Sequence, residues 1–152
     1  PSTLGFTNGL SKLLRAKGDF TAAEPLCREA LEARRTSLGE RHPSTLHSIN
    51  NLGRLLKEKG DLAAAEPLSR EALEGRREKL GARNPDTLSS ISNLGLLLMA
   101  KGDLAAAEPL LREALEGRRE VLGARHPKTL AAIKNLDKNL GALGGSGRPR
   151  RR

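Results

Sequence analysis

The chain repeats itself every 42 residues, and this period constrains its fold more than any other feature. Residues 42–83 and 84–125 differ at 9 of 42 positions, and residues 1–41 differ from 43–83 at 15 of 41. A fourth copy begins at His126 and stops after its first half. Such a period indicates a supersecondary unit that stacks on its copies, because one unit alone cannot bury its apolar face.

Each unit contains two amphipathic helical patterns separated by helix-stop residues. In the second unit, a helix-spaced apolar stripe over about 43–59 ends at Gly60, which we expect in a left-handed C′ conformation. Asp61 is then the predicted N-cap of a second helix, which ends at Gly81. Aromatic residues make up only 1% of the chain, and Val and Ile are few, which disfavours strands. We predict seven helices and no strand.

Small residues recur where the two helices of a unit should meet. Gly53 and Gly95 lie on the first helices, and alanines lie on the second helices, at Ala65, Ala72, Ala107 and Ala114. Small side chains allow a close approach of helix backbones, so we expect these positions at the contact. The predicted core is therefore leucine packed against alanine.

The repeat register divides the chain into an array over 1–143 and a flexible Gly/Ser-Arg tail over 144–152. The array contains units 1–41, 42–83 and 84–125 and a capping helix over 126–143. In that last helix, Asp137 and Asn139 replace glycine and leucine of the other units, and we expect both to face water. Sequence drift at a domain edge is the alternative. Because Pro1 has the register of Pro43, we expect an excerpt of a longer array.

The repeated residues resemble those of a known family. The pattern Leu52, Gly53, Leu56, Gly60, Ala65 and Ala72 resembles the tetratricopeptide repeat signature. The 42-residue period, the AAAEPL run and the closing LGARHP look like the long-form repeats of kinesin light chains and nephrocystin-type proteins. Cys27, Ser69 and Leu111 depart from the family, which usually has Tyr or Phe there. The resemblance implies an all-α, right-handed solenoid of about three and a half helix pairs that serves as a protein-interaction scaffold.

The resemblance also implies a site, because the first helix of each pair lines the concave groove in this family. The candidate groove residues are Asn8, Lys12, Arg15, Asn50, Asn51, Arg54, Lys57, Asn93, Leu96, Met99, Lys134, Asn135 and Lys138. Asn51, Asn93 and Asn135 match the asparagine that contacts a bound peptide's backbone or carboxylate. With an apolar middle and basic flanks, this surface suits an extended peptide with acidic residues around an apolar side chain. The alternative is that the cations form only a solvated surface.

The formal net charge of +9 leaves two other functions open. A nucleic acid or another polyanion is a candidate partner for the basic surface and the arginine tail, and salt dependence would reveal it. The lack of aromatic side chains for base stacking disfavours nucleic acid. The near-identity of the repeats also fits an engineered or recently duplicated structural array without a ligand. End-to-end stacking of copies stays open.

The remaining residues give no sign of catalysis. His42, His47 and His126 have no ligand spacing for a metal, and Cys27 occupies a position that favours a packed structural thiol. We find no phosphate loop and no Ser/His/Asp grouping, so we expect no enzymatic activity, cofactor or metal. No apolar stretch suggests membrane insertion. A single cysteine cannot close an intrachain disulfide, which favours a reducing compartment and a cytoplasmic location.

Overall fold

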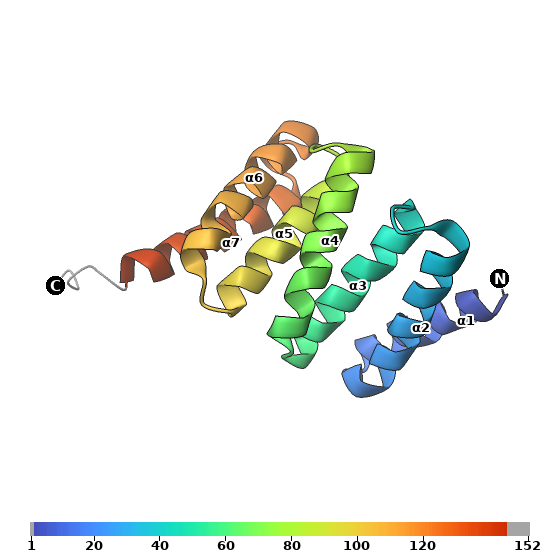
Figure 1. Ribbon diagram of the computed structural model, residues 1–152. Helices are drawn as coiled ribbons and strands as arrows, with labels where there is room; N and C mark the ends of the chain where they lie inside the picture. Colours follow the sequence, from blue (N-terminus) through green and yellow to red (C-terminus); the bar gives the residue numbers. More distant parts are fainter. Residues whose placement is uncertain (1, 146–152) are drawn as a thin grey trace. The chain divides into compact units, whose positions relative to one another are not determined.

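The structure, a computed structural model, describes residues 2–145, with the side chains of residues 9–144, and this range contains seven α-helices and no strand (Figure 1). The helices are α1 (Ser2–Ala16), α2 (Phe20–Leu38), α3 (Pro43–Lys59), α4 (Leu62–Leu80), α5 (Pro85–Ala100), α6 (Leu104–Leu122) and α7 (Pro127–Gly145). The predicted all-α helical repeat is confirmed. The chain forms two compact units, residues 1–79 and 80–152, which divide at the end of α4.

The residues before proline begin the first helix of a pair as the sequence predicts. The Nδ1 atom of His42 accepts a hydrogen bond from the Ser44 amide at 3.1 Å, and Asn84 caps α5 in the same way. Proline follows each cap at the first helical position, where an amide hydrogen would have no partner within the helix. Each repeat therefore restarts with a local signal that does not depend on tertiary packing.

Glycine and aspartate separate the two helices of a pair. Gly60 has a φ of 99° and a left-handed conformation, and its amide bonds to the carbonyls of Leu56 and Lys57. The Asp61 carboxylate then accepts a hydrogen bond from the Ala64 amide at 3.3 Å. Both predicted roles are confirmed. The sharp reversal brings α4 back along α3.

In the first unit, α1 packs on α2 and α2 packs on α3. The contact between α3 and α4 is close at Gly53, because a Cβ atom there would lie only 3.0 Å from Ser69 Oγ. Ala65 and Ala72 of α4 are fully buried. The predicted contact of small residues is confirmed, and any larger side chain at Gly53 would push the two helices apart.

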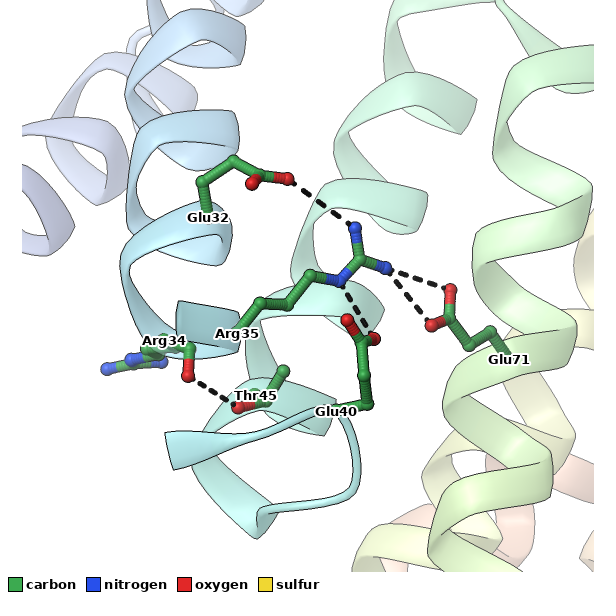
Figure 2. A network of polar contacts seen from close by, with 6 residues as sticks. All are labelled: Glu32, Arg34, Arg35, Glu40, Thr45 and Glu71. Carbon is green, nitrogen blue, oxygen red and sulfur yellow. Dashed lines mark hydrogen bonds and ion pairs between the residues drawn. The ribbon is translucent and has the colours of Figure 1, made fainter. Parts of the chain in front are cut away.

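A polar network also connects α2 with α4 in this unit (Figure 2). The Arg35 guanidinium donates to the Glu71 carboxylate at 3.0 Å and lies within ion-pair distance of Glu32 and Glu40. Glu32 is on α2, Glu40 is in the turn between α2 and α3, and Glu71 is on α4, so one arginine lies beside carboxylates from three segments. The cluster is partly exposed, and its contribution to stability is modest.

In the second unit, α5 packs on α6 and α6 packs on α7. Two expectations about α7 are wrong. The helix continues to Gly145, beyond the predicted end at 143, so Gly144 and Gly145 belong to the helix and not to the tail. Asn139 is completely buried and does not face water, because its Nδ2 atom donates to the Leu104 carbonyl of α6 at 3.0 Å. Asp137 is exposed, as predicted, and the rest of the predicted tail, 146–152, lies outside the described residues.

Candidate functional site

A cavity of about 490 Å³ lies among α1, α2 and α3 of the first unit, and we call it the unit-1 pocket. Its lining residues are Gly9, Ser11, Lys12, Arg15, Cys27, Ala30, Arg34, His47, Ser48, Asn51 and Arg54. Four of them are cationic and none is a carboxylate. A concave surface with one sign of charge raises the local concentration of ligands with the opposite charge.

Arg15 is the one of these four cations with an ion pair in the described part of the chain. Its Nε and Nη2 atoms donate to the two carboxylate oxygens of Glu58, at 2.9 and 3.0 Å. This hydrogen bonding raises the pKa of Arg15 and lowers the pKa of Glu58. The pair joins α1 to α3 at the edge of the pocket and orients the Arg15 guanidinium there.

Arg54 makes no hydrogen bond or ion pair with any residue that the structure describes. Partial burial lowers the pKa of Arg54, and the nearby charge of Arg15 lowers it further, while Glu58 opposes both effects. Two arginines therefore repel one another at the pocket. An anion placed between them would reduce this repulsion.

Arg34 enters the pocket from α2 and is held in place by α3. Its Nη1 atom donates to the Ser44 carbonyl at 3.0 Å and to Ser48 Oγ at 2.7 Å. The side chain is half-buried. A guanidinium has five N–H donors, so these two bonds leave others available to a ligand.

The neutral side chains of the pocket add hydrogen-bonding groups. The Nδ2 atom of Asn51 donates to His47 Nε2 at 3.1 Å, which leaves the Asn51 carbonyl oxygen and its second N–H for other partners. The thiol of Cys27 is half-buried, and burial raises its pKa although a hydrogen bond with Ser11 opposes this. Cys27 is thus protonated at neutral pH, as a structural thiol would be.

Comparison with known families gives the identity of the repeat. Tetratricopeptide repeat family models match residues 3–78 and 87–128. The chain is a tetratricopeptide repeat (TPR) protein. No curated protein sequence matches it significantly.

Solved structures support the same family for the TPR chain. It is similar to nearly identical TPR-like repeats of Podosopora anserina, from a protein assigned to the kinesin light chains, with a TM-score of 0.87. The two sequences are 25% identical, and the match covers 95% of this chain and 68% of the Podosopora anserina chain. A single-substitution variant of those repeats has 26% sequence identity to this chain and the same TM-score. BtubC from P. vanneervenii has the same fold, with 20% identity, a TM-score of 0.74 and coverage of 98% and 67%. TPR repeats generally mediate interactions between proteins, and the predicted resemblance to kinesin light chains is confirmed.

The unit-1 pocket of the TPR chain brings together four residues that the sequence predicts for the groove. These are Lys12 and Arg15 on α1 and Asn51 and Arg54 on α3. Lys57 is half-buried one turn beyond Arg54 and does not line the pocket, and burial lowers its pKa. The Asn8 side chain lies outside the described residues.

The prediction that Asn50 lines the groove is wrong. Asn50 is only 7% exposed. It lies on the same stripe of α3 as Leu46 and Gly53, at helical spacings of four and three, and this stripe packs against α4. Its side chain therefore belongs to the packing between the two helices of a repeat.

In the second unit, α5 and α7 carry the remaining predicted groove residues. Asn93, Leu96 and Met99 are half-exposed on α5. Asn135 is half-exposed on α7, and Lys134 and Lys138 are both exposed on the same helix. These side chains are accessible, and their binding role stays a prediction.

The pocket residues that α2 contributes were not predicted from the sequence. Arg34 lies on the second helix of its repeat, whereas all the predicted groove residues lie on first helices. The available signal was repetition, since arginine recurs at the same register as Arg76 and Arg118. A cation at a recurrently buried position needs a specific partner, and that requirement distinguishes these arginines from surface ones.

The described residues contain neither a cluster of metal ligands nor a helix that could span a membrane. Among them, no three His, Cys, Asp or Glu side chains group closely enough to hold a metal ion. None of the helices there combines the length and apolar character that a membrane span requires.

Proposed function

We propose that this TPR chain is a protein-interaction module that binds an extended acidic peptide segment through the unit-1 pocket. A partner protein would supply this segment. The pocket volume of about 490 Å³ lies within the usual range of ligand sites, roughly 300–1,000 Å³. The module needs no catalytic group, and its single cysteine fits a reducing compartment such as the cytoplasm.

The observation that carries this proposal is the convergence of Lys12, Arg15, Arg34 and Arg54 on a pocket whose lining residues include no carboxylate. Arg15 and Arg34 are half-buried, whereas Lys12 and Arg54 are exposed. Arg15 and Arg54 repel each other, so an anion bound between them would reduce this repulsion. Arg34 and Arg15 are already oriented by hydrogen bonds, so less side-chain entropy is lost when a carboxylate binds.

The neutral lining residues suit a peptide rather than an isolated anion. Asn51 offers an amide carbonyl and an N–H group, the two functions that pair with a peptide backbone. Gly9 occupies the equivalent position one repeat earlier, and no atom lies within 4 Å of where its Cβ would be. The backbone of a ligand could therefore approach α1 closely at this point.

Fluorescence anisotropy with a labelled ten-residue peptide of alternating Glu and Leu tests the proposal. We expect Arg54→Gln to weaken this probe by about tenfold, because it removes a charged partner from the pocket. Arg70→Gln is the matched control, since it removes the same charge from an exposed position on α4. Asn51→Ala should weaken the probe mainly through faster dissociation.

The same assay distinguishes peptide binding from the two alternatives, which are polyanion binding and a structural array without a ligand. Equal losses from Arg54→Gln and Arg70→Gln would place binding outside the pocket. Tighter binding of single-stranded DNA than of the peptide, lost on deletion of residues 148–152, would favour a polyanion partner. The absence of saturable binding to the acidic probe would favour a structural array without this ligand.

A further inference from the structure

A second, smaller cavity lies entirely in the second unit and has a different character from the unit-1 pocket. It has a volume of about 160 Å³ and lies among the start of α5, the end of α6 and the start of α7. Leu88, Val121 and Leu122 form part of its apolar wall, and Arg118, His126 and Lys128 form its polar side. No acidic residue lines it. We call it the Arg118 pocket.

Arg118 is a buried cation without a counterion. The residue is only 9% exposed, and it makes no hydrogen bond or ion pair with any residue in the described range. Burial lowers its pKa, and no neighbouring carboxylate opposes this effect. None of its nitrogen atoms is fully buried without a partner, so the guanidinium reaches the cavity that it lines. A cation in such a half-enclosed apolar setting is stabilised by an anion that pairs with it.

Comparison with the first repeat shows which contacts Arg118 lacks. The equivalent Arg34 donates to the carbonyl of Ser44 and to Ser48 Oγ. At the register of Ser48, 42 and 84 residues along the chain, Ser90 and then Ala132 occur. The methyl group of Ala132 cannot accept a hydrogen bond, so the donors that Arg34 uses within the protein remain available on Arg118.

A second polar contact of the first repeat is also absent here. Thr45 Oγ1 donates to the Arg34 carbonyl at 3.3 Å, but the equivalent Thr129 Oγ1 is buried without a partner. The junction of α6 and α7 therefore lacks the hydrogen bonds that Ser48 and Thr45 make with Arg34 in the first repeat. Its polar groups are incompletely satisfied in the chain alone.

We propose that the Arg118 pocket binds a small aliphatic carboxylate. The carboxylate would accept hydrogen bonds from the Arg118 guanidinium and pair with the Lys128 ammonium, while the hydrocarbon part lies against Leu88, Val121 and Leu122. The volume of about 160 Å³ limits the ligand to a small acid or to the terminal residue of a longer chain. A free branched-chain acid and the C-terminal residue of a protein both present this chemistry.

Titration of the full chain, followed by amide chemical shifts in NMR spectra, tests the proposal with three probes. These are 4-methylpentanoate, a hexapeptide that ends in a free leucine carboxylate, and the same hexapeptide with an amidated C-terminus. We expect saturable binding of at least one carboxylate probe, centred on α6 and α7, and none of the amide. Binding of the peptide acid would identify a protein C-terminus as the source, and binding of 4-methylpentanoate alone would identify a free acid.

Two matched variants localise the site. Arg118→Lys keeps the charge but loses the planar, two-bond geometry, so we expect at least fivefold weaker binding. Arg119→Lys makes the same change at the adjacent exposed position and should leave affinity unchanged. Melting curves report whether either variant folds, and the comparison of acid with amide does not depend on the variants. Equal binding of acid and amide, equal effects of the two variants, or no saturable binding would overturn the proposal.

Discussion

The guanidinium of Arg15 on α1 and the carboxylate of Glu58 on α3 form a two-bond ion pair, with donor–acceptor distances of 2.9 and 3.0 Å. Arg15 lines the unit-1 pocket and Glu58 does not. The pair therefore orients a pocket cation while it partly neutralises its charge. An acidic ligand must compete with Glu58 for Arg15.

Release of Arg15 from this competition should increase the affinity for acidic peptides. We expect Glu58→Gln to tighten binding of the Glu-Leu probe by roughly two- to fivefold, consistent with the modest energies of partly exposed ion pairs. Glu71→Gln is the control, because it releases Arg35 from the network of Figure 2, and Arg35 does not line the pocket. Weaker binding to Glu58→Gln would mean that orientation of Arg15 matters more than its free charge.

The same pair predicts how stability depends on pH. Hydrogen bonding to Arg15 lowers the pKa of Glu58 below its ordinary value of 4.5, and pairing with Lys59 and Arg28 lowers that of Glu24. The folded state thus favours ionised carboxylates, so their contribution is complete above pH 4.5 and is lost as the pH falls through the lowered values. Urea unfolding at pH 7 and pH 3 should show a loss of stability that Glu58→Gln reduces, by less than about 1 kcal/mol because the pair is partly exposed. An unchanged pH dependence in Glu58→Gln would contradict this.

Gly75 predicts a strong packing effect that the sequence did not reveal. A Cβ atom at Gly75 would clash with Leu46 and lie 2.9 Å from Arg41 Nη1. We expect Gly75→Ala to lower the free energy of unfolding by about 1–3 kcal/mol, because the core cannot expand locally. Gly141→Ala, at a helical position with no atom within 4 Å, should instead stabilise by up to about 1 kcal/mol. Urea unfolding measures both, and equal effects would show that the contact at Gly75 is not tight.

The helices were predictable because their signals are local and repeated. Gly60 ends a helix through its own backbone conformation, and His42 begins the next through one hydrogen bond to Ser44. Burial of polar residues was less predictable, since it depends on which neighbouring helix lies over them. Asn50 and Asn139 are both buried by helix contacts that the repeat period does not specify.

The lining of the unit-1 pocket was predictable only in part, because it also depends on how neighbouring helices lie against each other. Lys12, Arg15, Asn51 and Arg54 share first-helix positions, so one rule finds all four. Arg34 reaches the pocket from the other helix because Ser48 and the Ser44 carbonyl orient it. Such an orientation follows from distances between helices, and the sequence contains no direct record of them.

The hydrogen bond between Arg34 and Ser48 predicts that its removal lowers the stability and that an equivalent bond at Arg118 raises it. Ser48 is 6% exposed, and Ser48→Ala should cost about 1–2 kcal/mol because a partly buried cation loses an acceptor. Ala132→Ser would supply Arg118 with the equivalent hydroxyl, and we expect a gain of up to about 1 kcal/mol. Thermal unfolding of the two variants measures this. Destabilisation by Ala132→Ser would show that α7 is not positioned over Arg118 as α3 is over Arg34.

Cys27 provides a direct probe of the unit-1 pocket, because it is the only cysteine and it lines the cavity. Burial raises the pKa of its thiol above the ordinary value of 9.0, so little thiolate is present at neutral pH. Alkylation by iodoacetamide at pH 8 should be at least about fivefold slower than that of glutathione, since only the thiolate reacts and access is limited.

Occupancy of the pocket should slow this reaction further. With the Glu-Leu probe at saturation, we expect an additional threefold or greater decrease in the alkylation rate of Cys27, measured by mass spectrometry. In Arg54→Gln, the same peptide concentration should give less protection, because the peptide binds more weakly. Protein unfolded in urea is the reference and should react at a rate that the peptide does not change. Full reactivity of Cys27 in the saturated complex would place the bound peptide elsewhere on the TPR surface.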